Sequence, residues 1–196
     1  MAKVLKLGAL YPKHLNLNGD HGNLLVLKKR LEWSGIDAET VAVDDTSSLA
    51  SYDFILVGHG SKAAWLDIQA RETRFVENVA NYISSGGAAL VISSAYDLLA
   101  MKVFGKSEGV GSHRSEFVKT KDGIVGYLNT GSQEKQLIWQ NNALFTLLHG
   151  PVLAKNPDLA DQFIRQLGFE PSTTQSLRIQ NVDNLAGQAR RIAFEN

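Results

Sequence analysis

The sequence predicts an α/β fold in which a mostly parallel central sheet lies between two layers of helices. Short apolar runs typical of buried strands alternate with longer segments that carry apolar residues on one helical face. Such alternation is typical of a doubly wound sheet with helices on both faces. The 196 residues contain neither an internal repeat nor a linker, so we expect a single domain over residues 1–196.

The elements follow from apolar periodicity and from residues that start or stop helices. We expect parallel strands at residues 4–10, 40–43, 54–57, 88–92 and 143–148. Helices are expected at residues 24–35, 71–84, 96–103, 157–168 and 182–194, and short strands within residues 114–139. Gly35, Gly86 and Gly168 mark helix ends, and Asn156 followed by Pro157 marks a helix start.

Composition narrows the function classes. Lys plus Arg equals Asp plus Glu, 20 against 20, which argues against general binding to nucleic acid or to an anionic membrane. The run Lys28-Lys29-Arg30 is interpreted as a solvated helix face. No apolar run approaches the length of a membrane span, and the N-terminus reads as a strand and not as a signal peptide, so we expect a cytoplasmic protein. Neither a metal site nor a cofactor is predicted.

Two residues stand out as a catalytic pair. The stretch from Ala88 to Ala100 runs from an apolar strand through small residues into a helix, the layout of a nucleophile elbow with Ser93 at the turn. His149 follows the last predicted central strand. Because the carboxyl ends of parallel strands share one edge of the sheet, Ser93 and His149 are expected to face each other there, 56 positions apart in the chain.

Backbone donors for a developing negative charge are predicted beside this pair. Gly58 and Gly60 follow the third strand and allow a backbone N–H to approach a ligand closely. The N–H of Ser94, which follows the nucleophile position, would be the second donor. A plain glycine turn is the alternative interpretation, and His59 is expected to be an exposed loop residue.

The connection from Tyr11 to Asn23 is long for a strand-to-helix loop and carries several turn and cap formers. One interpretation is an elaborate helix cap with Asp20 or Asn23 at the N-cap. The other is a partner or ligand loop in which Asn16, Asp20 and Asn23 face the candidate site.

The chain resembles the CobB/CobQ-type branch of class I glutamine amidotransferases, and within it the GatD glutaminase subunits of lipid II isoglutaminyl synthase. The resemblance covers most of the chain and is carried by L-Y-P-K-H-L-N-L-N-G-D-H-G-N near the N-terminus and by L-L-H-G-P-V-L-A-K-N-P around His149. It implies a flavodoxin-like, three-layer α/β/α glutamine amidotransferase-like domain. It also implies a Mur-ligase-like (MurT-like) partner subunit and a glutamine-like small ligand.

The resemblance fails where the chemistry should lie. The family's Cys-Gly-Gly-Tyr-Gln elbow is here Ser93-Ser94-Ala95-Tyr96-Asp97, so the nucleophilic cysteine is missing. The run from Gly126 to Gln133 corresponds to the family's Gly-Phe-Glu-Asn-His-Gly-Gly-Arg. This chain keeps the asparagine as Asn129 but has Gln133 where the family has the arginine that should help hold the substrate.

These losses predict an impaired glutaminase, because a serine hydroxyl ionises far less readily than a thiol. No carboxylate adjoins His149, and Asp97 and Glu116 are distant candidates to orient it. Three hypotheses stay open. The first is a degenerate amidotransferase subunit that keeps its partner surface. The second is an active glutaminase or acyl hydrolase that uses Ser93 and His149, and the third is a non-catalytic binding protein.

Overall fold

The computed structural model describes residues 3–172 and 177–195, and its centre is a six-stranded sheet in the order β2-β1-β3-β4-β8-β7. The first five strands in that order are mutually parallel, and β7 pairs antiparallel with β8 at one edge. The strands are β1 (Leu5–Leu10), β2 (Ala38–Val43), β3 (Phe54–Val57), β4 (Ala88–Ile92), β7 (Leu137–Gln140) and β8 (Ala143–Thr146).

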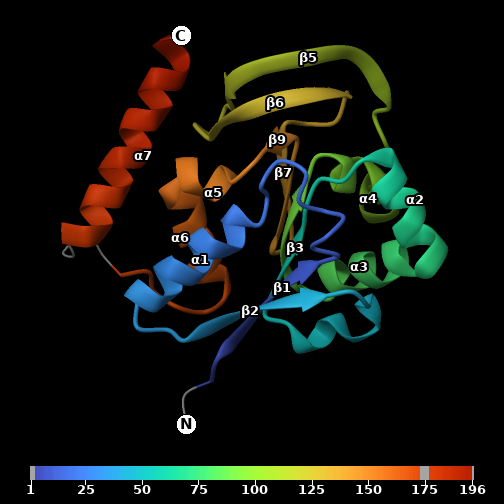
Figure 1. Ribbon diagram of the computed structural model, residues 1–196, viewed down its shortest axis with the longest axis horizontal. Helices are drawn as coiled ribbons and strands as arrows, with labels where there is room; N and C mark the ends of the chain where they lie inside the picture. Colours follow the sequence, from blue (N-terminus) through green and yellow to red (C-terminus); the bar gives the residue numbers. More distant parts are fainter. Residues whose placement is uncertain (1–2, 173–176, 196) are drawn as a thin grey trace.

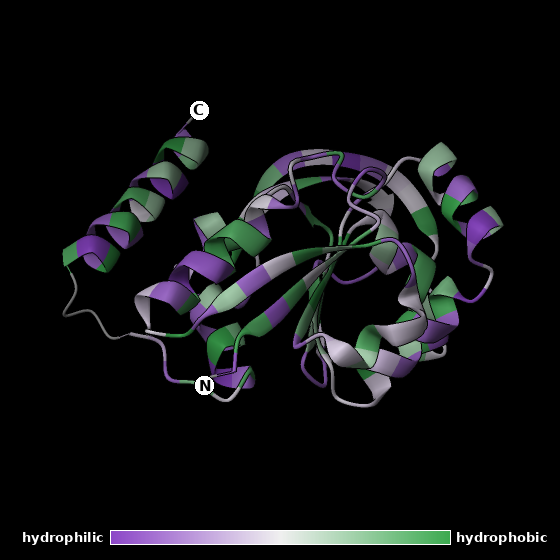
Figure 2. Cartoon of the chain, turned by 60° about the horizontal axis from the view of Figure 1, so that its bottom comes forward, coloured by the Kyte–Doolittle hydropathy of each residue, from purple (hydrophilic) through white to green (hydrophobic). Residues whose placement is uncertain are grey.

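Helices cover both faces of this sheet (Figure 1). One face carries α1 (Gly22–Trp33), α5 (Val152–Lys155) and α6 (Pro157–Gln166), with α7 (Leu177–Glu195) outside them. The other face carries α2 (Lys62–Arg71), α3 (Phe75–Ser84), α4 (Ser94–Phe104) and the 3₁₀ helix η1 (Thr46–Ser51). All residues of β3, β4 and β8 are buried, and Figure 2 shows these strands as the apolar centre of the molecule. The predicted three-layer α/β architecture is confirmed.

A second, antiparallel sheet lies over the carboxyl edge of the first (Figure 1). Its strands are β5 (Val110–Lys119), β6 (Val125–Ser132) and β9 (Leu148–His149), in the order β5-β6-β9. After β8 the chain leaves the main sheet at Thr146 and joins this second sheet, where His149 pairs with Tyr127. The predicted strand 143–148 is therefore two strands, because its last residues pair with β6 and not with β4.

The predicted helix 71–84 is also wrong in its start. The helix preceding it, α2, ends at Arg71, and α3 begins only at Phe75. Glu72 adopts a non-helical conformation, and its carboxylate accepts hydrogen bonds from the Tyr11 hydroxyl at 2.7 Å and the Thr46 backbone N–H at 3.0 Å. These tertiary contacts interrupt the helix where apolar periodicity alone would continue it.

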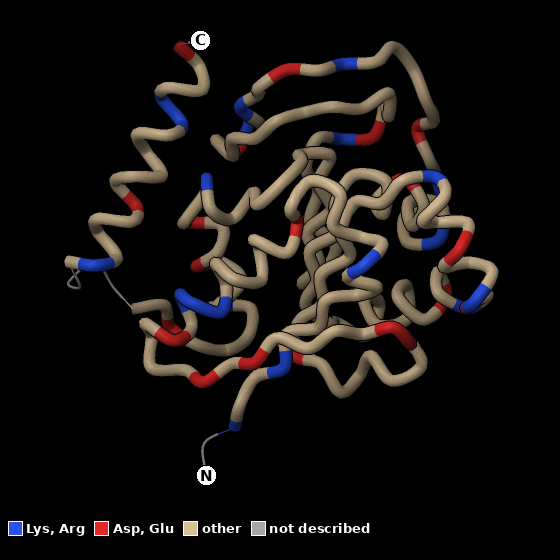
Figure 3. Tube along the Cα trace, in the orientation of Figure 1, with Lys and Arg blue, Asp and Glu red and all other residues tan. Residues whose placement is uncertain are grey.

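Charges of both signs are interspersed over the molecule (Figure 3). One correction concerns the basic run in α1: Arg30 is not solvated but 95% buried, and its guanidinium pairs with Asp161 of α6 and Asp183 of α7, each at 2.7 Å. Arg30 thereby joins three helices. Among the described residues no helix is both long and apolar enough to cross a membrane.

Candidate functional site

Ser93 lies in a sharp turn between β4 and α4. Its φ is 51° and its ψ is −110°, a backbone conformation that L residues rarely adopt. The Ser93 N–H donates to the Thr146 carbonyl of β8 at 2.7 Å, and the Ser93 carbonyl accepts from the Asp97 N–H at 3.0 Å. This strained turn, fixed by both neighbouring elements, has the form of a nucleophile elbow.

The structure brings His149 to this turn. Its Nε2 atom lies 3.1 Å from the Ser93 hydroxyl oxygen. The approach is possible because β8, which neighbours β4, ends at Thr146 and the chain then bends into β9. Ser93 is 3% exposed and His149 is 6% exposed, so a substrate would reach the pair only after a neighbouring segment moved.

The two other hydrogen bonds of His149 decide which of its nitrogens carries the proton. Nε2 also lies 3.0 Å from the Asn129 carbonyl oxygen, which can only accept, so Nε2 must donate. On the other side of the ring, the Asn18 amide is oriented with its nitrogen 2.6 Å from Nδ1, and in this orientation the nitrogen donates and Nδ1 accepts. Both contacts select the neutral tautomer with its hydrogen on Nε2.

That tautomer is the reverse of the one a general base needs. In a catalytic triad the nitrogen facing the nucleophile has a free lone pair, and the other nitrogen donates to a carboxylate. Here the nitrogen facing Ser93 carries the hydrogen, and an amide replaces the carboxylate. Burial also lowers the pKa of His149, partly opposed by its hydrogen bond to Asn129, which favours the neutral ring.

The predicted oxyanion donors are both occupied. The Ser94 N–H donates to Nδ1 of His59 at 3.3 Å, and the Gly60 N–H donates to the Ser94 hydroxyl oxygen at 3.0 Å. That hydroxyl also accepts from the Trp65 indole N–H and donates to the Gly60 carbonyl. Neither donor can receive an oxyanion unless these side chains move.

His59 was expected to be exposed, and this expectation is wrong. It is half-buried, and its ring packs edge-on against His149 with the ring centroids 4.8 Å apart. Burial, followed by the proximity of His149, lowers the pKa of His59 to about 4. His59 is therefore a neutral acceptor for the Ser94 N–H near neutral pH.

Gly58 permits close packing rather than ligand access. A Cβ atom there would stand 2.1 Å from the Leu15 carbonyl oxygen. The neighbouring N–H of His59 donates to the Asp20 carboxylate at 2.9 Å. The loop after β3 is thus fastened to the loop after β1.

The Tyr11–Asn23 loop is held from inside. Asp20 is fully buried, and burial raises its pKa to about 6 despite the backbone N–H groups of His59 and Gly150. Asn23 is also fully buried: its amide donates to the Asp20 and Gly150 carbonyls, and its oxygen accepts from the Leu153 N–H. The Asn16 side chain accepts from the His21 N–H at 3.0 Å.

These contacts correct the expected use of the loop. The side chains of Asp20 and Asn23 join the loop to the segment after His149 and offer nothing to a partner in this conformation. The exposed part of the loop is its tip, where Leu17 is 62% exposed and Asn18 reaches His149.

The remaining predicted residues lie on the second sheet. Asn129 contributes its main-chain carbonyl to His149, whereas its side chain pairs with His113 at 2.9 Å. Gln133 is exposed, and its side chain lies against Gly111 in the β5–β6 hairpin. Of the two candidate orienters, Glu116 is exposed and Asp97 is hydrogen-bonded to Ser132, while Asn18 occupies the place beside Nδ1.

Sequence reasoning missed Asn18 and His59 as site residues. No motif in the sequence marks Asn18 as a partner of His149, because a carboxylate and not an amide is the usual partner of a catalytic histidine. Its position in a long loop rich in asparagine was the available signal.

No family model matches the chain. The chain is 25% identical over 205 residues to the GatD subunit of lipid II isoglutaminyl synthase (glutamine-hydrolyzing) from Streptococcus pneumoniae, covering 82% of this chain and 79% of that protein. It is 22% identical over 229 residues to the GatD subunit from Staphylococcus aureus, covering 92% and 91%.

The fold agrees with these similarities. A glutamine amidotransferase from Thermotoga maritima superposes with a TM-score of 0.51 over 97% of this chain and 94% of that one, at 12% identity. The chain is thus similar over most of its length to GatD subunits and has the flavodoxin-like fold of glutamine amidotransferases, but its 196 residues include no cysteine.

Proposed function

We propose that this chain is a glutamine amidotransferase-like subunit that has lost its glutaminase chemistry and acts in the cytoplasm with a Mur-ligase-like partner. The observation that carries the proposal is the placement of His149 between Asn18 and Asn129. Both contacts put the hydrogen on Nε2, so His149 cannot accept the Ser93 proton in this arrangement.

Two further observations support loss of the reaction. A serine replaces the family's cysteine at the elbow, and the two expected oxyanion donors are bonded within the protein. Loss of a single oxyanion donor typically lowers the rate by about 10²–10³. In this arrangement the tautomer of His149, the weak nucleophile and the occupied oxyanion donors together leave no route to an acyl intermediate.

The similarity to GatD subunits supports a partner. Each of these relatives is one subunit of a lipid II isoglutaminyl synthase. The exposed tip of the Tyr11–Asn23 loop beside His149 is the surface that we propose for the contact, with Leu17 at its centre.

Both parts can be tested. We expect no ammonia from L-glutamine with the purified chain, and no difference between it and a Ser93→Ala variant. Co-expression with a Mur-ligase-like protein from the same genome should give a stable complex on size exclusion. Leu17→Asp should weaken that complex, whereas Leu185→Asp on α7, equally 62% exposed, should not. Failure to form any complex would contradict the partner assignment.

A serine-dependent hydrolase is the second candidate. It is favoured by the strained elbow and by the 3.1 Å contact between Ser93 and His149. This candidate requires Asn18 and His59 to move, and it predicts hydrolysis of activated esters that Ser93→Ala abolishes.

A further inference from the structure

A pocket lies at the same edge of the main sheet as the Ser93 elbow, but nearer the other end of the strand order. It is about 300 Å³ in volume and lies at the ends of β1 and β2 and beside the end of α2. Its lining residues are Tyr11, Lys13, His14, Asp44, Asp45, Arg71 and Glu72. Ser93 and His149 follow β4 and β8, and β3 separates the two places in the strand order, so this pocket is distinct from the elbow.

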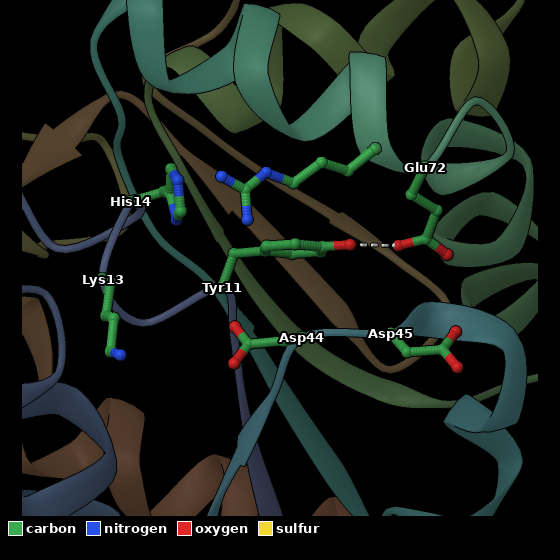
Figure 4. A pocket seen from close by; sticks show the side chains of 7 residues that line it. Tyr11, Lys13, His14, Asp44, Asp45 and Glu72 are labelled. Atoms are coloured by element: carbon green, nitrogen blue, oxygen red, sulfur yellow. Dashed lines mark hydrogen bonds between the residues drawn. The ribbon is translucent and has the colours of Figure 1, made fainter.

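Hydrogen bonds hold the floor of the pocket in place. The Tyr11 hydroxyl donates to Glu72 at 2.7 Å (Figure 4), and Glu72 also accepts from the backbone and hydroxyl of Thr46 and from Asn78. Glu72 is thus fully occupied in holding the phenol ring. Tyr11 itself has a φ of 43°, which is rare for a bulky residue. Such strain persists where surrounding contacts hold it, and it concentrates at ligand sites.

Charges of both signs remain available around this floor. Within the described parts of the chain neither Lys13 nor Asp44 has a hydrogen-bond or ion-pair partner, although both line the cavity. Arg71 uses its Nε to pair with Asp67 at 2.9 Å, which leaves its terminal N–H groups for another acceptor. Asp45 is engaged by contrast: its two carboxylate oxygens accept from the N–H and the hydroxyl of Ser47 at the start of η1, and the side chain is exposed at the rim.

The geometry points to a binding site for a small zwitterion of the α-amino acid type. Its carboxylate would meet Lys13 and Arg71, its ammonium group would meet Asp44, and its side chain would lie over the Tyr11 ring. A simple anion would leave the two aspartates repelling it, and a simple cation would face Lys13 and Arg71. A ligand with both charges satisfies both sides.

The same loop links this pocket to the elbow. The loop begins with the pocket residues Tyr11, Lys13 and His14. Further along it, the Leu15 carbonyl packs against Gly58, and the Asn18 side chain contacts His149. A ligand that fixes Lys13 therefore acts on the segment that sets the tautomer of His149. The zwitterion site itself does not depend on whether the elbow reacts.

The test is a titration of the uniformly ¹⁵N-labelled full chain in which the amide chemical shifts are recorded at each ligand concentration. The probes are L-alanine and L-glutamine as zwitterions, and acetate, methylammonium and inorganic phosphate as single charges. We expect saturable shifts at residues 11, 13, 14 and 44–46 with the amino acids, and at least about tenfold weaker binding of each single-charge probe.

Variants of the pocket test which charged side chains bind the ligand. Lys13→Met and Asp44→Asn should each weaken amino acid binding about tenfold, and both residues are exposed, so the fold should persist. Lys62→Met, which removes an exposed lysine outside the pocket, should leave binding unchanged. Phosphate or acetate binding as tightly as L-alanine would overturn the zwitterion assignment. Shifts centred on Ser93 and His149 that survive Lys13→Met, or no saturable shift with either amino acid, would overturn the site.

Discussion

The amide nitrogen of Asn18 lies 2.6 Å from Nδ1 of His149, where a catalytic histidine would donate to a carboxylate. An amide and a carboxylate have nearly the same shape, yet an amide whose nitrogen faces the ring demands the opposite tautomer from a carboxylate. This one pairing, together with the Asn129 carbonyl at Nε2, turns a nucleophile–base geometry into a neutral hydrogen-bonded pair.

Asn18→Asp should therefore switch the tautomer. A carboxylate at Nδ1 accepts the ring hydrogen and stabilises the charged ring, so we expect the pKa of His149 to rise by about 1–3 units. Imidazole ¹⁵N shifts across a pH titration report both the tautomer and the pKa. Asn18→Leu, which keeps the size but neither donates nor accepts, is the control, and an unchanged spectrum in Asn18→Asp would refute the assigned contact.

Restoring the thiol alone should not restore chemistry. In Ser93→Cys the ring nitrogen that faces the sulfur already carries a hydrogen and cannot take the thiol proton, so we expect the pKa of the thiol to stay at about 8.5. Adding Asn18→Asp should lower that pKa and raise the rate of iodoacetamide alkylation at pH 7 by about tenfold. Glutamine hydrolysis should stay low, because the N–H groups of Ser94 and Gly60 are still bonded within the protein. Full glutaminase activity in the single variant would show that the orientation of His149 is unimportant.

Asp20 should make stability depend on pH. Its folded pKa of about 6 lies above the ordinary aspartate value of 3.8, so the folded state holds this proton more tightly than the unfolded chain does. The Asp20 contribution to the free energy of unfolding is therefore greatest at low pH and falls as pH rises from about 4 to 6, by roughly 3 kcal/mol. The pKa of His59 is instead lowered to about 4, so the His59 contribution to the free energy of unfolding rises with pH, over a pH range that overlaps the range for Asp20.

Comparing the unmodified chain with Asp20→Asn isolates the contribution of Asp20 to the free energy of unfolding. Urea unfolding of Asp20→Asn and the unmodified chain at pH 4, 5, 6 and 7 should show the variant gaining relative stability as pH rises. The same difference at every pH would mean that Asp20 is not a buried ionisable group.

Gly58 should tolerate no side chain. The Cβ of alanine would stand 2.1 Å from the Leu15 carbonyl oxygen, so Gly58→Ala should destabilise the protein by about 1–3 kcal/mol or more. Gly187→Ala in α7, where the nearest atom is 3.9 Å away, should instead be neutral or stabilise by about 0.5–1 kcal/mol. Thermal melts compare the two, and equal melting temperatures would contradict the packing described here.

The sequence was informative where one local rule decides the outcome. The apolar strands, the Ser93 elbow and the meeting of Ser93 with His149 follow from strand order and from the shared carboxyl edge of parallel strands. The split of residues 71–84 into two helices could not be predicted, because Glu72 is drawn out by Tyr11 and Thr46, which are distant in sequence. The burial of Arg30 likewise depends on Asp161 and Asp183.

Site chemistry was harder to predict than site position. The occupancy of the Ser94 N–H by His59, and the amide at Nδ1 of His149, depend on how two loops pack together. No spacing rule encodes either contact, so the sequence could locate the pair but not the tautomer.

Loss of glutaminase chemistry can be measured as ammonia release from L-glutamine, both by the purified chain and by its complex with a Mur-ligase-like protein. We expect no release above the Ser93→Ala background in either sample, because His149 carries its hydrogen on the nitrogen that faces Ser93. Ammonia release that is abolished both by Ser93→Ala and by His149→Ala would contradict it and establish a serine-dependent glutaminase.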